Sequence, residues 1–191
     1  MERKNLESAA ANYSGLRGLH AIPLGMVIVL SGVTNMGWGP LPPVWVFSVA
    51  VLLAGVAYWR ITRFYQENYG RITPSRSTQA RVAVGTVLSI PVASGGVHLD
   101  WNHDLPINAT AAAFGLLMLV CYGINVGLRK HHLILCGGLL AAGLLPVWGA
   151  VEPDLKINLG LILAGFVIMA TGIFDHGVLK RTFGGLDVSN V

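Results

Sequence analysis

Six long apolar runs constrain this chain more than any other feature of its sequence. They cover residues 19–38, 41–59, 82–97, 105–128, 133–150 and 155–174. Each is close to the length of roughly 20 residues that a helix needs to cross the hydrocarbon of a bilayer. Charged residues make up only 12% of the chain, about half of their usual share in a soluble domain. We therefore predict an all-α, polytopic membrane protein: a bundle of six transmembrane helices.

The basic residues predict the orientation of these helices. Twelve of the thirteen Lys and Arg residues fall on the same side as the N-terminus, and only Lys156 falls on the other side. Basic residues concentrate in cytoplasmic segments, so we predict that both termini are cytoplasmic. The same asymmetry accounts for the net charge of +4 without a nucleic-acid partner. The expected location is the plasma (inner) membrane of a prokaryote, because the chain is compact and carries no targeting signal.

The segments outside the runs are short. We predict a cytoplasmic N-terminal segment (1–18), a six-helix transmembrane domain (19–176) that includes a cytoplasmic loop (60–81), and a cytoplasmic C-terminal tail (177–191). None of these segments is long enough for a soluble catalytic domain. Ionisable residues are also excluded from the centre of every run, although functional membrane sites commonly place them there. Both observations favour a protein that is not an enzyme.

Small residues at helical spacing predict close contacts between helices. The pairs are Gly123 with Gly127 in the fourth run and Gly160 with Ala164 in the sixth. Residues four apart share one helix face, and a small-xxx-small pair lets two backbones approach closely within a membrane. We interpret these pairs as packing contacts of the bundle, with docking onto another membrane subunit as the alternative.

Two clusters of polar residues are candidate cofactor sites. The outer loop after the third run carries imidazoles and carboxylates that could bind a divalent metal ion: His98, Asp100, His103 and Asp104. Its spacing matches no standard metal motif, so an ordinary solvated loop is the simpler interpretation. Four histidines at cytoplasmic span ends are the second cluster: His20, His131, His132 and His176. Paired histidines can ligate a haem, whereas a basic interfacial corner against anionic lipid is the simpler interpretation. For both clusters the leading interpretation includes no cofactor, and a haem or a divalent metal ion is the alternative.

Two cytoplasmic segments have expected structural roles. We expect the second helix to continue past the membrane and to end by Gly70. Basic and aromatic residues of this cytoplasmic segment are expected to contact lipid headgroups or a partner: Arg60, Arg63, Tyr65, Tyr69 and Arg71. Near the end of the sixth run, Asp175 and His176 point about 100° apart on a helix and cannot pair with each other. We expect Asp175 to accept a hydrogen bond from an Arg or His of a neighbouring helix end.

These observations leave three functional hypotheses. The leading one is a non-catalytic accessory or structural subunit of a larger membrane complex or transporter, whose partners are the bilayer and other membrane subunits. The second is a small oligomeric transporter with a lumen lined by Asn35, Asn125 and hydroxyl side chains. The third is a haem- or metal-binding redox protein that uses the histidines at the span ends. No motif in the sequence is specific enough to indicate a family.

Overall fold

A computed structural model describes residues 16–37, 43–70, 76–125 and 127–183. These residues form six α-helices and one short 3-10 turn, η1 (Gly18–His20): α3 (Ala21–Asn35), α4 (Pro43–Tyr69), α5 (Arg76–Asn102), α6 (Ala109–Asn125), α7 (Lys130–Leu144) and α8 (Pro153–Phe183). Within these ranges the chain contains no strand, so the all-helical prediction is confirmed. Arg71 and most of the turn between the first two runs lie outside the described residues.

Four segments are long and apolar enough to cross a membrane: Gly18–Asn35, Val44–Tyr69, Arg76–Asn102 and Pro153–Thr182. The other two helices, α6 and α7, have only 17 and 15 residues. At 1.5 Å per residue they are about 26 and 23 Å long, less than the roughly 30 Å of a hydrocarbon core. Four helices are therefore long and apolar enough to cross a membrane, which indicates a membrane protein, but the prediction of six spans is not confirmed.

The two short helices end early for local reasons. The fifth apolar run was expected to reach residue 150, but α7 ends at Leu144 because Leu145 precedes Pro146 and takes an extended conformation (ψ 134°). The fourth run was expected to cover 105–128, but α6 ends near Gly127, which has φ +84° and donates its N–H to the Tyr122 carbonyl. The expected extension of the second helix is present, and it ends before Gly70, where φ is +81°.

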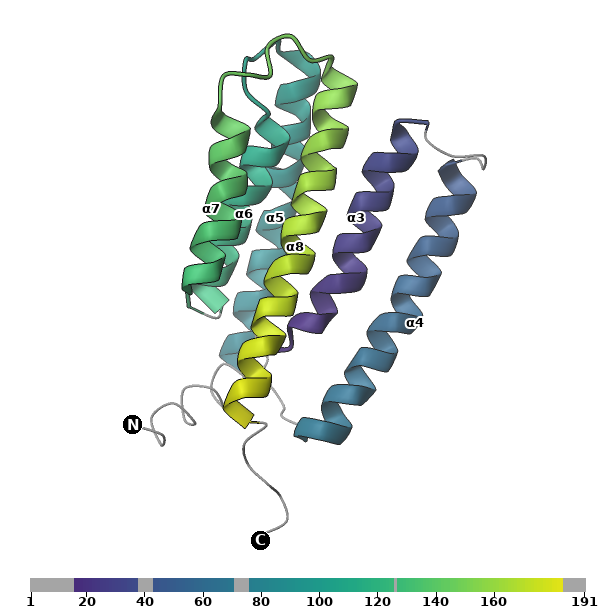
Figure 1. Ribbon diagram of the computed structural model, residues 1–191, viewed down its shortest axis with the longest axis vertical. Coiled ribbons are helices and arrows are strands. Elements are labelled where there is room, and N and C mark those ends of the chain that lie inside the picture. The colour runs from purple at the N-terminus through teal and green to yellow at the C-terminus, as the bar shows by residue number, and fades with distance from the viewer. Residues whose placement is uncertain (1–15, 38–42, 71–75, 126, 184–191) are drawn as a thin grey trace, which may run out of the picture.

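The six helices run side by side, with α8 at the centre (Figure 1). On one side α8 packs against α3, and on the other against α6 and α7. Of the remaining two helices, α4 packs on α3, and α5 packs on α6. We call the end where α6 and α8 begin the upper end. The lower end is the opposite one, where α4 ends and α5 and α7 begin.

A seam of small residues joins α3 to α8. Three glycines, seven residues apart in η1 and α3, each face a residue of α8, and these α8 residues are also seven apart. The pairs are Gly18 with Gly172, Gly25 with Gly165, and Gly32 with Asn158. A Cβ on Gly25 would lie 2.6 Å from the carbonyl oxygen of Gly165, and a Cβ on Gly165 would lie 2.6 Å from the carbonyl oxygen of Gly25. The two backbones are therefore in contact, which residues with a side chain would prevent.

The small pairs expected from the sequence lie in different surroundings. Gly160 faces α6, where an added Cβ would lie 2.8 Å from Asn108 Oδ1, and Ala164 is fully buried. Gly123 faces only the Leu128 side chain, at 3.8 Å, and Gly127 lies beyond the end of α6 with no atom within 4 Å. Gly160 and Ala164 are thus in a tight contact between helices, whereas Gly123 and Gly127 lie in and just beyond the last turn of α6.

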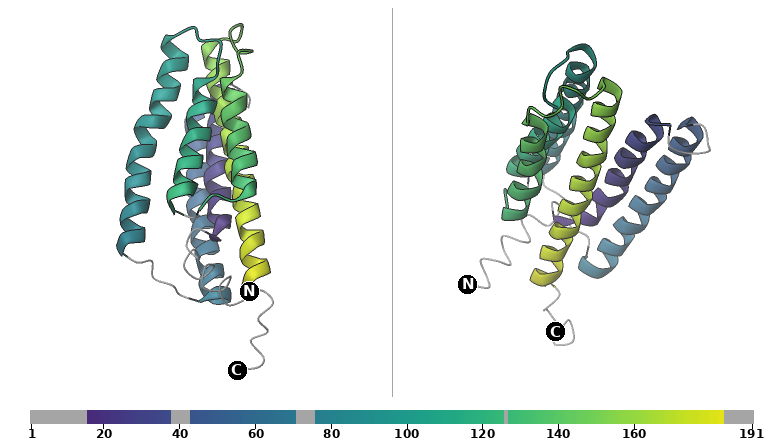
Figure 2. Two further views of the ribbon diagram at one scale, coloured as in Figure 1. Left: turned by 90° about the vertical axis from the view of Figure 1, so that its left-hand side faces the viewer. Right: turned by 45° about the horizontal axis from the view of Figure 1, so that its top comes forward.

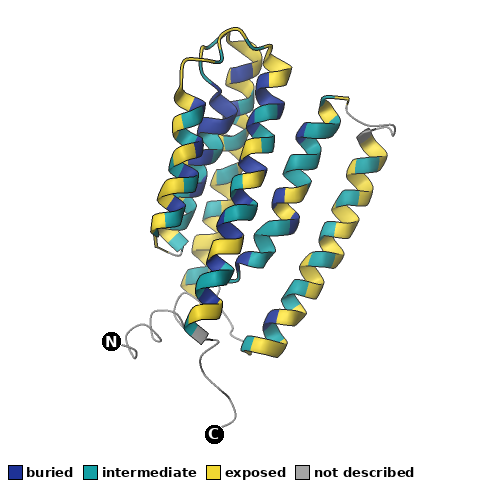
Figure 3. Cartoon of the chain, viewed as in Figure 1, coloured by how far each residue is buried: buried dark blue, intermediate teal, exposed yellow. Residues whose placement is uncertain are grey.

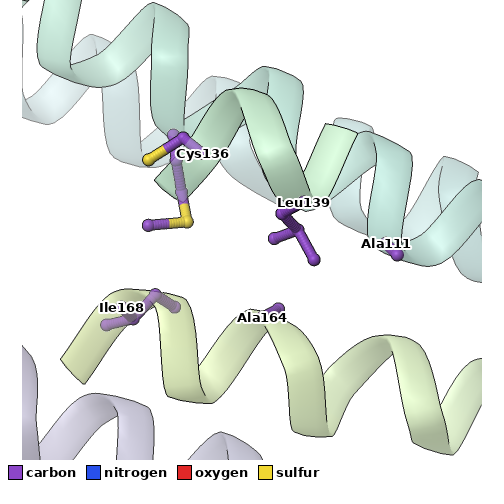
Figure 4. Close-up of a cluster of buried hydrophobic side chains, with 6 residues drawn as sticks. Ala111, Cys136, Leu139, Ala164 and Ile168 are labelled. Carbon is purple, nitrogen blue, oxygen red and sulfur yellow. The ribbon is translucent and has the colours of Figure 1, made fainter. Parts of the chain in front are cut away.

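The apolar core lies between α6, α7 and α8 (Figure 4). Four of its six members are small or contain sulfur, namely Ala111, Met118, Cys136 and Ala164, and the other two are Leu139 and Ile168. Burial falls steeply away from this core (Figure 3). In the most apolar stretch of α8, 44% of the residues are buried, whereas the figure is 6% in α5 and 0% in α4. Two of the four long helices are therefore apolar on faces that the chain itself does not cover.

Candidate functional site

Three ionisable side chains meet inside the lower end of the bundle. His131 and His132 lie in the first turn of α7, and Asp175 lies on α8. The Nε2 atom of His131 is 3.0 Å from Asp175 Oδ1, and that of His132 is 3.1 and 3.2 Å from the two carboxylate oxygens. Both imidazoles donate, because a carboxylate oxygen only accepts. The expectation that Asp175 accepts hydrogen bonds from a neighbouring helix end is confirmed.

This cluster is shielded from solvent. The side chains of His132 and Asp175 are 0% and 2% exposed, and that of His131 is 17% exposed. The Tyr122 ring of α6 stacks on the His132 ring at 3.9 Å, and its hydroxyl donates to Thr171 of α8 at 2.9 Å. Three helices therefore hold the His132 ring in place, and only His131 offers a path to the surface.

A backbone hydrogen bond selects the tautomer of a neutral His132. The N–H of Arg129, which precedes α7, donates to His132 Nδ1 at 3.3 Å. Since Nδ1 accepts in this bond, the ring proton of a neutral His132 is on Nε2, where it points to Asp175. The arrangement therefore satisfies Asp175 as a charged acceptor and ties the start of α7 to α8.

The same three side chains are the one group in the described part of the chain that could hold a metal ion. One ligand atom from each lies within 4.8 Å of the others. Two imidazole nitrogens and one carboxylate oxygen form a donor set that suits Zn²⁺ and similar ions. To bind through Nε2, His132 would have to move its proton to Nδ1, which then could no longer accept from Arg129.

The other two histidines form a separate cluster around Tyr65 of α4. Tyr65 is fully buried against Leu16 and Leu179. Its hydroxyl accepts from the N–H of Leu19 at 3.2 Å and lies 3.0 Å from His176 Nδ1. His20 stacks on the Tyr65 ring at 5.4 Å. This contact holds the lower part of α4 to η1 and α8.

The four histidines at the span ends are therefore split into two pairs. His131 and His132 converge on one carboxylate, whereas His20 and His176 flank the ring of one tyrosine. A haem with two histidine ligands needs imidazoles on opposite faces of the macrocycle. The His131 and His132 ring centroids are 4.2 Å apart, and the rings of His20 and His176 each contact the ring of Tyr65.

The four candidate metal residues of the expected upper loop do not form a metal-binding group, and two of them, His98 and Asp100, lie in the last turns of α5 rather than in a loop. Asp100 is fully buried, and its two carboxylate oxygens accept the N–H groups of Ala109 and Thr110 at 2.8 and 2.7 Å. His98 is exposed and lies 3.0 Å from the Asn102 amide, while His103 and Asp104 are exposed in the loop. Asp100 serves as a cap for α6, because the first N–H groups of a helix have no partner within it.

A network that the sequence analysis missed completes this upper end. Asn108 accepts the Ala111 N–H through Oδ1 and donates to the Lys156 carbonyl through Nδ2, each at 2.8 Å. The buried Lys156 ammonium donates to the Leu105 carbonyl at 2.8 Å. An Asn directly before an apolar run is a helix-start signal, so the cap could have been found. The partners of Lys156 come from distant segments and leave no local signal.

The other predicted contact and pore residues are scattered. On α4, Arg60 and Arg63 are exposed, with the Arg63 guanidinium 4.3 Å from the centre of the Trp59 ring, and Tyr69 is half-buried beside the buried Tyr65. Asn35 lines a groove between α3 and α4 at the upper end. Asn125 lines another groove, between α5 and α6. Within one chain, the two asparagines therefore line different grooves.

Comparisons with protein-family models, curated proteins and solved structures gave no match to this chain.

Proposed function

We propose that the protein is an integral membrane protein of six spans with both termini in the cytoplasm of a prokaryote, so that the lower end is cytoplasmic. The distribution of the basic residues supports this orientation. The two short helices lie alongside the upper part of α8 (Figure 1). On this proposal residues 19–176 form the membrane domain, and residues 1–18, 60–81 and 177–191 are cytoplasmic.

Within that membrane, we propose that the protein is a non-catalytic accessory subunit of a larger membrane complex. The observation that carries this role is the exposure of α4. Its span covers Val44–Tyr69, and none of its most apolar 18 residues is buried. The helix is held to the bundle by α3 and, at its lower end, by Tyr65. Helix contacts in membranes rest on close packing, and a partner helix would supply this packing to α4.

Native-membrane extraction in a mild neutral detergent tests this role. We expect the protein to migrate with other membrane subunits, at a mass well above its own 20.3 kDa plus detergent. Leu52→Trp and Leu53→Trp place bulk on exposed apolar positions of α4 and should dissociate such a complex. A control, Ile134→Trp, changes a comparably exposed position on α7 and should leave it intact. A wild-type protein that migrates alone would contradict the accessory role.

The His131–His132–Asp175 cluster favours a second candidate function, the binding of a divalent transition-metal ion. The ligand atoms already lie within 4.8 Å of one another, and the partly exposed His131 gives the ion a way in. The imidazoles and the carboxylate would hold the ion, which as a Lewis acid would polarise a bound oxygen. The hydrogen bond between Arg129 and His132 opposes this function, since it places a proton on the ligand atom.

Isothermal titration calorimetry of the purified protein with Zn²⁺ tests whether the cluster binds a metal ion or serves helix packing alone. Metal binding predicts one equivalent of Zn²⁺ per chain, release of a proton and loss of binding in His131→Ala. The matched control is His103→Ala, which removes an exposed imidazole at the other end of the molecule. Binding that His131→Ala leaves unchanged, or no binding, would assign the cluster to helix packing alone.

A further inference from the structure

An open apolar groove of about 230 Å³ lies between the lower parts of α5 and α6. Its walls consist of aliphatic side chains, one glycine and one thiol: Val84, Gly85 and Leu88 from α5, and Leu117, Val120 and Cys121 from α6. At its lower end it is bounded by Arg81 and Asn125. The groove thus combines an apolar channel with a cationic group at one end.

The groove exists because α5 and α6 are close at the upper end and farther apart below. At Gly96 an added Cβ would lie 2.7 Å from the Ala113 Cβ. At Gly85, three turns lower, it would lie 3.7 Å or more from any atom of α6. The left view of Figure 2 shows α5 at the side of the bundle, with α6 as its neighbour. The lower half of α5 therefore leaves space that the chain does not fill.

The depth of the groove matches one leaflet of a bilayer. The lining residues run from Arg81 to Leu88 on α5 and from Leu117 to Asn125 on α6. At 1.5 Å per residue these stretches extend about 10 to 12 Å, less than half of the roughly 30 Å hydrocarbon core. An acyl chain that enters from the lower leaflet would fit this depth.

The polar atoms at the lower end suit a phospholipid headgroup. Arg81 is exposed, and one of its five N–H groups makes a long hydrogen bond, 3.4 Å, to the Ile124 carbonyl. Its guanidinium is therefore held across the mouth of the groove with donors left for a phosphate. Asn125 donates through Nδ2 to the Cys121 carbonyl at 3.0 Å, but its buried Oδ1 has no hydrogen-bond partner. This oxygen could accept from a headgroup hydroxyl.

We propose that this groove binds one anionic phospholipid, with an acyl chain between α5 and α6 and the phosphate at Arg81. Basic pockets between helices on the cytoplasmic side are known to bind anionic headgroups. The inference rests on the membrane placement proposed above. It does not depend on the accessory role or on the metal, so its failure would leave both of those unaffected.

Native mass spectrometry measures the preference for an anionic phospholipid. The protein in neutral detergent is mixed with equal amounts of phosphatidylglycerol and phosphatidylcholine of the same chain length. We expect one retained phosphatidylglycerol per chain and a preference of about fivefold over phosphatidylcholine, the effect of one basic side chain near an anionic surface. Arg81→Gln should abolish the preference. Arg181→Gln, which removes an exposed guanidinium near the end of α8, should retain it.

Two glycine variants test the apolar part of the groove. Gly85→Leu should fill it and remove the retained lipid, because an added Cβ meets only ordinary contacts at 3.7 and 3.8 Å. Gly95→Leu adds the same side chain to the same helix where nothing lies within 4 Å, and it should keep the lipid. Equal retention of the two phospholipids by wild type, or an unchanged preference in Arg81→Gln, would overturn the proposal. So would full retention in a folded Gly85→Leu protein.

Discussion

The upper and lower ends of the molecule both bury ionisable side chains, but they satisfy them with different partners. At the upper end, Asp100 accepts only backbone N–H groups, and Lys156 donates to a backbone carbonyl. At the lower end, Asp175 accepts from His131 and His132, and Tyr65 contacts His176. Backbone partners cannot reorient without moving a helix, whereas side-chain partners can rotate or exchange a proton. The upper end is therefore suited to hold the helices, and the lower end is the one that can change.

The largest effect should come from Asp100→Ala at the upper end. The substitution leaves the N–H groups of Ala109 and Thr110 buried without acceptors, and it removes a negative charge from the N-terminus of α6. We expect the free energy of unfolding to fall by about 3 kcal/mol, measured by titration of the micellar protein with dodecyl sulfate. Asp104→Ala removes an exposed carboxylate from the loop that follows α5 and should change little. Equal losses in the two variants would mean that the cap has no special role.

A smaller loss, about 2 kcal/mol, should follow from Asp175→Ala at the lower end. Two imidazole N–H groups lose their acceptor, but the partly exposed His131 can turn toward solvent and His132 can change tautomer. Asp175→Asn keeps an acceptor oxygen in nearly the same volume and should recover at least half of the loss. Thermal unfolding followed by circular dichroism compares the three proteins. If Asp175→Ala costs more than Asp100→Ala, the contrast between the two ends is wrong.

The contrast also shows what the sequence could predict. Helix content and the approximate spans follow from the apolar runs, because a membrane requires that length and composition. The sequence also predicts that Asp175 and His176 do not pair, since their directions follow from helix geometry. It does not predict that His131 and Asp175 meet, or that Lys156 reaches Leu105, because these pairs depend on how distant helices pack. The seven-residue spacing from Gly18 to Gly32 was a readable signal of that packing.

Tyr65→Phe tests the link between α4 and the rest of the lower end. The phenyl ring keeps the contact with Leu16 and Leu179, while the hydrogen bonds to Leu19 and His176 are lost. We expect a loss of about 1 kcal/mol and faster hydrogen exchange in the last turns of α4, measured by mass spectrometry. The ring of Tyr58 is exposed beside His20, so Tyr58→Phe should alter neither quantity. Unchanged exchange in Tyr65→Phe would show that packing alone holds the helix.

The smallest effect should come from Lys156→Met, although the ammonium is as buried as Asp100. Within the described residues, the Lys156 ammonium donates one hydrogen bond, to the carbonyl of the half-buried Leu105. Its removal also ends the cost of keeping a charge away from water, and replacement of a buried ion by an apolar group of similar volume is often neutral. We expect the free energy of unfolding to change by less than about 0.5 kcal/mol, and Lys156→Ala, which loses the packing as well, to be clearly less stable. A loss for Lys156→Met as large as that for Asp100→Ala would show that the two charges stabilise the upper end jointly. In that case the helix cap alone would not account for its rigidity.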